Sequence, residues 1–149
     1  MRSFKYFTYG VLAVTLLAGT MEAFAGELDL RWSVSIGSKH FNTDVDYNEF
    51  NPGVGYEARL DADSKVYAVG GMYYNSESTT SMYGGVGHEG IQVHPDVQLG
   101  AEVGLVTGYS GGFILPVVAG VVRVSDHLKM LVLPPTPVSP LTVGVQVVF

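Results

Sequence analysis

The stretch Leu28-Asp29-Leu30-Arg31-Trp32-Ser33-Val34-Ser35-Ile36 decides the class of fold. Its apolar residues occupy every second position, and Asp, Arg or Ser stands between them. Successive side chains of a β-strand point to opposite faces, so this period predicts a strand with one apolar and one polar face. The same alternation returns at residues 97–105 and 143–149. No stretch after Gly26 shows a long helical period, so we predict an all-β protein.

Turn residues divide the chain into eight segments of strand length. We expect strands at residues 28–36, 53–60, 65–74, 81–89, 96–106, 112–123, 127–133 and 140–149. Tilted transmembrane strands need about 9 to 11 residues, and bacterial barrels have an even number of strands. The predicted fold is an eight-stranded antiparallel up-and-down transmembrane β-barrel, located in the bacterial outer membrane.

Alternation alone fits both a membrane barrel, with its apolar face outward, and a soluble barrel, with that face inward. Three features favour the membrane. The last strand closes on Phe149, the chain has no cysteine or charged surface strand, and several tyrosines fall near predicted strand ends. Those tyrosines are Tyr56, Tyr67, Tyr73, Tyr74 and Tyr83.

The N-terminus has the pattern of a signal peptide. Arg2 and Lys5 precede a short apolar stretch at 11–18, and Ala23-Phe24-Ala25 matches a cleavage site. A membrane anchor is the alternative, but the stretch is short and Glu22 interrupts it. We therefore predict a signal peptide over residues 1–25 and a barrel domain over residues 26–149.

The composition is acidic, with a net charge of −6 that becomes −7 once residues 1–25, which hold two basic residues and one acidic one, are removed. Without a basic patch, nucleic acid is excluded as a partner. We expect membrane lipids as partners, a monomer, no disulfide and no cofactor.

The connections between the predicted strands fall into two sets, because every second connection of an up-and-down barrel lies at the same end. One set is mostly short and polar, as periplasmic turns are, at 61–64, 90–95 and 124–126. The other set is predicted to face outward, at 37–52, 75–80, 107–111 and 134–139.

Two outward connections bring a histidine and a serine to one rim. His40 lies in the first connection, and Asn75-Ser76 begins the second. A histidine can take a proton from a hydroxyl, and serine can act as a nucleophile or an oxyanion donor. The alternative is an ordinary solvated loop, in which Asn48 and Asn51 shape the turn before Pro52-Gly53.

His88 and His94, with Glu89 between them, suggest a metal site only superficially. They fall at the predicted periplasmic end and lack a third ligand of clear spacing. We predict no metal.

Glycines inside predicted strands allow two interpretations. Small inward residues leave room in the lumen for a rod-like apolar ligand, or they let the strands of a narrow barrel coil tightly. The glycines are Gly70, Gly71, Gly84, Gly85, Gly87, Gly100 and Gly104.

Prolines fall inside the sixth predicted strand and between the seventh and the eighth. Pro116 lies inside the sixth, and Pro134, Pro135, Pro137 and Pro140 crowd the connection between the seventh and eighth. Proline cannot donate to the ladder, so a gap there would be a side door for lipid. For Pro137 and Pro140 we favour the alternative of a rigid external loop.

Five features in this order resemble the outer-membrane lipid A palmitoyltransferase family across the barrel region. They are His40 followed by Tyr47-Asn48-Glu49 and Gly53-Val54-Gly55, then 71–76 (GMYYNS), 83–87 (YGGVG), Leu115-Pro116-Val117, and Pro134. The resemblance implies an eight-stranded barrel whose lumen measures an acyl chain and whose prolines open lateral access. It further implies that palmitate passes from a phospholipid to lipid A at the outer rim.

The resemblance implies His40 as base and Ser76 as its hydroxyl partner, with Asn75 where the family has Asp. It implies a substrate-binding set of Tyr47, Asn48, Glu49, Gly85, Pro116 and Pro134. An amide cannot steady a protonated histidine as a carboxylate does, so either another acid such as Glu49 substitutes or the chemistry differs. The first loop is also shorter than the family's, and the family's N-terminal amphipathic helix is absent.

Our leading hypothesis is an acyltransferase-like barrel that transfers an acyl chain from phospholipid to lipid A. One rival is a lipid A deacylase, which would use the same His40 and Ser76 with water as acceptor. Another is a non-enzymatic barrel that stabilises the membrane or binds an apolar molecule. The sequence leaves open the acyl-chain length, the two lipids and whether the lumen is open.

Overall fold

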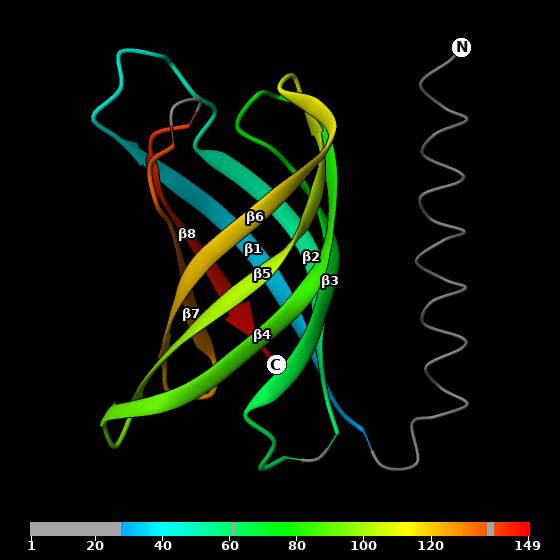
Figure 1. Cartoon of the computed structure of the whole chain (residues 1–149), viewed down its shortest axis with the longest axis vertical. Helices are drawn as coiled ribbons and strands as arrows, with labels where there is room; N and C mark the ends of the chain where they lie inside the picture. Colours follow the sequence, from blue (N-terminus) through cyan, green and yellow to red (C-terminus); the bar gives the residue numbers. More distant parts are fainter. Residues whose placement is uncertain (1–27, 61, 137–138) are drawn as a thin grey trace.

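Eight antiparallel strands close into a barrel in the computed structural model, which describes residues 28–60, 62–136 and 139–149 (Figure 1). They are β1 (Asp29–Phe41), β2 (Phe50–Arg59), β3 (Val66–Tyr74), β4 (Thr80–His94), β5 (Val97–Tyr109), β6 (Gly112–Val124), β7 (Leu128–Leu133) and β8 (Leu141–Val148). Each strand pairs with the next, and β8 pairs with β1. The predicted all-β, eight-stranded antiparallel barrel is confirmed.

The signal peptide predicted over residues 1–25, and the Gly26 start of the barrel domain, lie outside the described residues. Within the described ranges, no helix has the length and apolar character needed to cross a membrane.

The connections alternate between two ends, as predicted (Figure 1). The β1–β2, β3–β4, β5–β6 and β7–β8 connections form one end, which we call the loop end. The β2–β3, β4–β5 and β6–β7 connections form the other, which we call the turn end.

Several strands are longer than predicted. β1 and β2 take up both ends of the predicted 37–52 loop and leave residues 42–49 between them, β4 runs on to His94, and β5 runs on to Tyr109. The register shifts between Ser35 and Gly37 in β1, and again between Glu89 and Ile91 in β4. A bulge inserts an extra residue and breaks the period of two, so the alternation appears to stop where the strand in fact continues.

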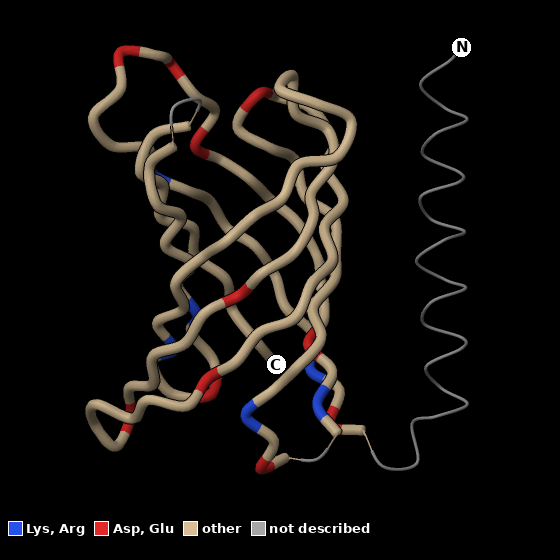
Figure 2. The backbone as a smooth tube through the Cα atoms, in the orientation of Figure 1, with Lys and Arg blue, Asp and Glu red and all other residues tan. Residues whose placement is uncertain are grey.

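Charged side chains occupy the barrel interior, whereas large apolar side chains cover its outside. We call six buried residues the interior charge cluster: Glu57, Arg59, Glu89, Glu102, Arg123 and Lys129. On the outside, Trp32 is 52% exposed and Val118 is 58% exposed. Figure 2 shows that charged residues of the strands gather towards the turn end, while acidic residues mark the loops of the other end.

Three of the tyrosines that were expected at the membrane interface, Tyr67, Tyr73 and Tyr83, instead face the barrel interior. Tyr67 is buried and donates to Glu102 inside the barrel, and the hydroxyls of Tyr73 and Tyr109 lie 2.9 Å apart. Tyr83 also points inward, because its hydroxyl fills the space beside Gly55. A polar lumen satisfies these hydroxyls, whereas an apolar outer surface would not.

Tyrosine rings fill much of the space that the glycines leave. A Cβ at Gly87 would lie 2.2 Å from Cζ of Tyr67, and one at Gly71 would lie 2.8 Å from the Tyr83 ring. At Gly104 the nearest atom would be the backbone oxygen of Gly84, at 2.5 Å. These positions therefore allow tight packing, in agreement with the second interpretation of the glycines.

We expect Gly87→Ala to lower the free energy of unfolding by about 1–3 kcal/mol, because the added methyl overpacks a fixed ring. Tyr67 cannot turn away easily, since it donates to Glu102 at 3.0 Å and its ring lies 4.6 Å from the Arg59 guanidinium carbon. Urea unfolding measures the change. The control is Gly84→Ala, whose methyl would meet its nearest neighbour at 3.8 Å. Equal stability of the two variants would contradict this packing.

Candidate functional site

The bulge in β1 decides which way His40 points. Before the bulge, Ser33 and Ser35 pair with Val148 and Gln146, which are buried; after it, His40 pairs with the buried Thr142. Directly opposed residues of antiparallel strands project to the same face. The inward positions of β1 are therefore odd-numbered before the bulge and even-numbered after it, which places His40 on the inner side of the rim.

The His40 ring stacks on Tyr47, with centroids 4.4 Å apart and an interplanar angle of 21°. Its Nδ1 atom is buried and has no hydrogen-bond partner within the described ranges. Glu49 approaches the histidine through the backbone: its Oε1 lies 3.5 Å from the His40 amide nitrogen, which donates to it. The ring is thus held by stacking, and its buried Nδ1 is free to bond to a ligand within the described part of the site.

Glu49 carries a negative charge beside this histidine. Lys39 Nζ donates to Glu49 Oε2 at 3.0 Å, and this hydrogen bond holds the pKa of Glu49 below its ordinary value. No hydrogen bond joins the Glu49 carboxylate to the His40 ring in the described part of the chain. The expectation that Glu49 replaces the family's Asp therefore stays a prediction.

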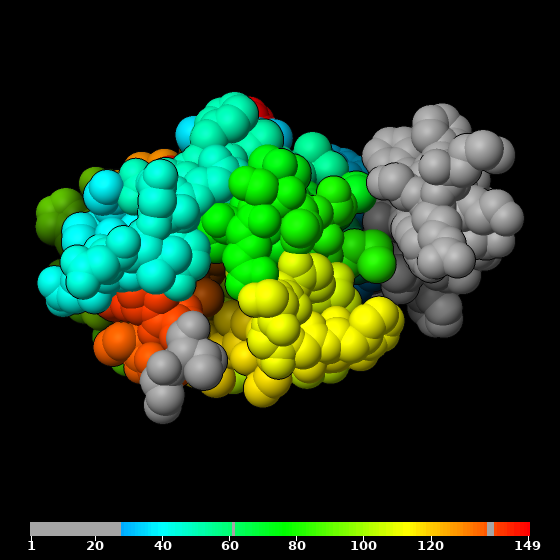
Figure 3. Space-filling model, turned by 90° about the horizontal axis from the view of Figure 1, so that it is seen from above, coloured from blue at the N-terminus to red at the C-terminus, as the bar shows by residue number. Residues whose placement is uncertain are grey.

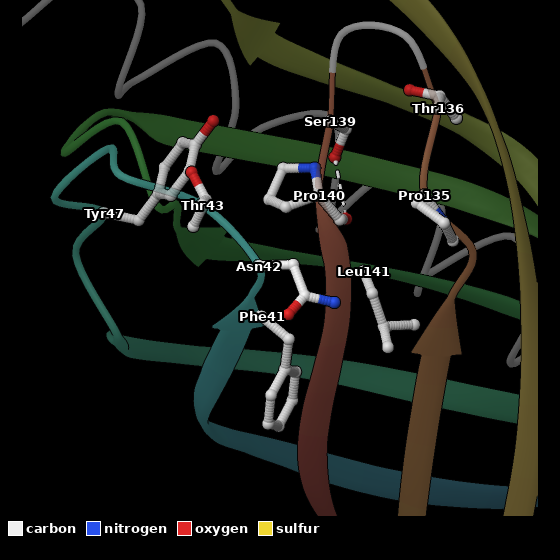
Figure 4. A pocket seen from close by; sticks show the side chains of 9 residues that line it. All are labelled: Phe41, Asn42, Thr43, Tyr47, Pro135, Thr136, Ser139, Pro140 and Leu141. Atoms are coloured by element: carbon white, nitrogen blue, oxygen red, sulfur yellow. Dashed lines mark hydrogen bonds between the residues drawn. The ribbon is translucent and has the colours of Figure 1, made fainter.

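Two adjoining pockets open at the loop end on either side of Tyr47. One, of about 470 Å³, is lined by His40 with Lys39, Asp46 and Glu49 among others. The other, of about 450 Å³, lies between the β1–β2 loop and the β7–β8 connection (Figure 4). Its lining is uncharged: Phe41, Asn42, Thr43, Tyr47, Pro135, Thr136, Ser139, Pro140 and Leu141.

Asparagine side chains tie the loops of this end together. Asn48 Nδ2 donates to the backbone oxygen of Asn75, and the Asn48 amide nitrogen donates to the oxygen of Ser76. Asn51 is buried, accepts from the Ser38 hydroxyl and donates to the oxygen of Tyr74. In the view onto the loop end, the cyan β1–β2 loop lies against the green β3–β4 connection (Figure 3).

Asn75 organises the β3–β4 connection from within. It is fully buried, and its Nδ2 donates to Thr79 Oγ1, Ser81 Oγ and the oxygen of Gly108 at 2.8–2.9 Å. Its Oδ1 accepts from the backbone nitrogens of Glu77 and Thr79. Donor and acceptor groups are all in use, so the geometry gives Asn75 a structural role at the position where the resemblance implied a catalytic one.

Ser76 lies next to the histidine's loop without touching the histidine. Its backbone oxygen accepts from Asn48, while its hydroxyl has no hydrogen-bond partner among the described residues. The described structure contains no His40–Ser76 hydrogen bond. The structure brings the two loops together but leaves the predicted pair unbonded.

The other predicted substrate-binding residues belong to other parts of the barrel wall than β1, which carries His40. Gly85 in β4 pairs with Gly104 in β5, and Pro116 in β6 pairs with Leu105 in β5. Pro134 follows the last residue of β7.

The pairing between β6 and β7 is incomplete. β6 starts at Gly112, but its register with β7 begins only at Gly120, because β7 ends at Leu133. Among the described residues, the half of β6 nearest the loop end therefore has no ladder partner in β7, and Pro116 lies within that half. From above, a hollow separates the yellow β5–β6 turn from the orange β7–β8 connection (Figure 3).

The interior charge cluster escaped the sequence analysis. Glu57, Glu89 and Arg123 each occupy an inward position of a strand. The sequence did contain a sign of it. Charged residues alternate with apolar ones in these strands, and if the apolar residues face outward, the buried charges need ion-pair partners inside the barrel. His88 and His94 are exposed, and no group of three potential metal ligands occurs among the described residues.

The comparisons with known proteins leave the family of this chain open. No protein-family model matches it, and no curated protein matches it.

Asn75→Asp tests the structural role of this residue. The aspartate would have no N–H groups to share among Thr79, Ser81 and the Gly108 oxygen and would place a charge against that oxygen, so we expect a loss of about 1–3 kcal/mol of unfolding free energy. Asn42→Asp is the matched control, because Asn42 is an exposed residue of the same end. Urea midpoints measure both. If Asn75→Asp were as stable as the control, the amide donors would be dispensable.

Proposed function

We propose that this chain is an outer-membrane barrel that transfers an acyl chain from a phospholipid to lipid A at its loop end. The observation that carries the proposal is the short β6–β7 ladder: among the described residues, the loop-end half of β6 has no partner in β7, at the same end as His40.

The distribution of side chains supports a membrane location. Apolar residues cover the outside, where Leu105 is 55% and Val103 is 54% exposed, while Glu57 and Arg123 are buried inside. A soluble barrel has the opposite arrangement, since it must bury its apolar face. In β1 the outward apolar positions run from Leu30 to Ile36, and the exposed Lys39 follows them. We therefore place the membrane-spanning part of β1 on the turn-end side of Lys39.

The incomplete β6–β7 ladder supports lateral entry of lipid. A closed barrel satisfies its backbone groups between strands, and the hydrocarbon core offers no alternative partner. Pro116 has no backbone N–H, so one hydrogen-bond donor fewer is left without a partner in this part of β6. An acyl chain would pass the wall here, with its ester group near the rim that carries His40.

His40 suits the role of base in this transfer. Near pH 7 a large fraction of histidine side chains is neutral and can accept a proton. The buried Nδ1 of His40 has no hydrogen-bond partner within the described part of the chain. His40 would take the proton of an acceptor hydroxyl, whose oxygen forms the new ester bond with the acyl carbon. The bond between that carbon and the glycerol oxygen breaks, and the imidazolium returns the proton to the departing lysophospholipid.

A non-enzymatic barrel is the second candidate. It is favoured by the full hydrogen bonding of Asn75 and by the tyrosine rings that fill the interior beside Gly55 and Gly87. Such a barrel would stabilise the membrane or bind an apolar molecule at its wall.

Lipid A mass spectra from a Gram-negative host that expresses the chain test the proposal. We expect one added acyl chain with the natural sequence and its loss in His40→Ala. His88→Ala is the control, because this exposed histidine lies near the turn end. Heat-modifiable migration of the outer-membrane fraction reports folding and location for all three chains.

Each outcome has a defined meaning. Loss of an acyl chain from lipid A would favour the deacylase. An unchanged spectrum from a folded barrel in the outer membrane would rule out both lipid A enzymes and leave the non-enzymatic candidate. Absence of the folded chain from that membrane would contradict the membrane location itself.

A further inference from the structure

The six members of the interior charge cluster form one continuous chain of contacts. Arg59 donates to Glu89 at 2.9 Å, and Arg123 donates to both Glu89 and Glu57. Lys129 continues the chain, since it donates to Glu57 and, at 2.9 Å, to Glu102. At the Glu102 end of this chain of contacts, the Tyr67 hydroxyl donates a hydrogen bond of 3.0 Å to Glu102.

This chain of contacts crosses the barrel. Glu57 belongs to β2 and Arg123 to β6, and three strands separate these two on either side of the ring. They therefore lie on opposite walls, yet Arg123 Nη2 and Glu57 Oε2 are 2.7 Å apart. Side chains that meet across the diameter obstruct the lumen at that level.

The cluster is also electrically balanced. Its three carboxylates, Glu57, Glu89 and Glu102, face three cations, Arg59, Arg123 and Lys129, and all six are buried. Rings of one sign attract ions of the opposite sign in pores, whereas a set with equal numbers of opposite, mutually paired charges offers an ion no net attraction. Arg59 Nε and Arg123 Nη1 are buried without a hydrogen-bond partner among the described residues, but both belong to cations that are already paired with carboxylates.

We infer that the interior charge cluster is a permeability seal that closes the barrel to ions. The inference rests on the membrane location in the proposed function but is independent of acyl transfer. Because the seal consists of equal numbers of positive and negative side chains, removing side chains of one sign opens a passage lined by side chains of the opposite sign. The sign of the removed charges then sets the ion selectivity.

Planar-bilayer recordings of the full chain test the seal, after vesicle flotation has established insertion. The intact protein should show no conductance steps. Arg123→Ala/Lys129→Ala leaves Arg59 against three carboxylates, so it should conduct and select cations. Glu57→Ala/Glu89→Ala leaves Glu102 against three cations, so its reversal potential in a KCl gradient should have the opposite sign. Asp29→Ala/Arg31→Ala, which removes an ion pair between neighbouring residues of β1, should stay silent.

Heat-modifiable gel migration shows which variants have folded. If a double variant fails to fold, a single variant takes its place: Lys129→Ala for the first and Glu57→Ala for the second. Each single variant should show the same ion selectivity as the double variant that it replaces. Conductance by the intact protein, silence of the folded cluster variants, or one selectivity shared by both would overturn the seal. An inserted but conducting chain counts against the seal alone. A chain that does not insert also contradicts the membrane location.

Discussion

The contact between Glu57 and Arg123 is the constraint on which the rest of the barrel depends. Opposite walls meet there, and a buried carboxylate that loses its partner costs about 3–5 kcal/mol. The contact also fixes register, because sliding β6 by one residue would turn Arg123 to the outside. The interior charge cluster thus restricts how strands far apart in the sequence combine, in addition to any stability that it contributes.

That constraint leaves the two ends of the barrel free to differ. Towards the turn end the lumen is filled by paired charges, with Tyr67 packed against Gly87. Towards the loop end the wall is looser, since β7 stops at Leu133 and β6 continues without it. The contacts of the turn end hold the barrel closed, so the β6–β7 ladder can be short at the loop end without loss of closure.

The rim chemistry depends on local details. One bulge in β1 turns His40 inward, and the asparagines at 48, 51 and 75 hold the surrounding loops. The Asn75 amide, at the position where the resemblance implies a catalytic residue, forms hydrogen bonds within its own turn, and its catalytic role stays a prediction. Within the described residues, His40 keeps a buried Nδ1 without a hydrogen-bond partner, so its role as a base stays a prediction that the geometry permits.

The sequence by itself determined the all-β class, the strand number and the alternation of connections, because a period of two and turn residues are local signals. It did not determine where β1 and β4 end, since a bulge hides a strand's continuation from any periodic pattern. Only the tertiary structure decided that Tyr67, Tyr73 and Tyr83 face inward and that Glu57 meets Arg123. Those facts depend on closure of the ring, which brings together residues that no spacing in the sequence connects.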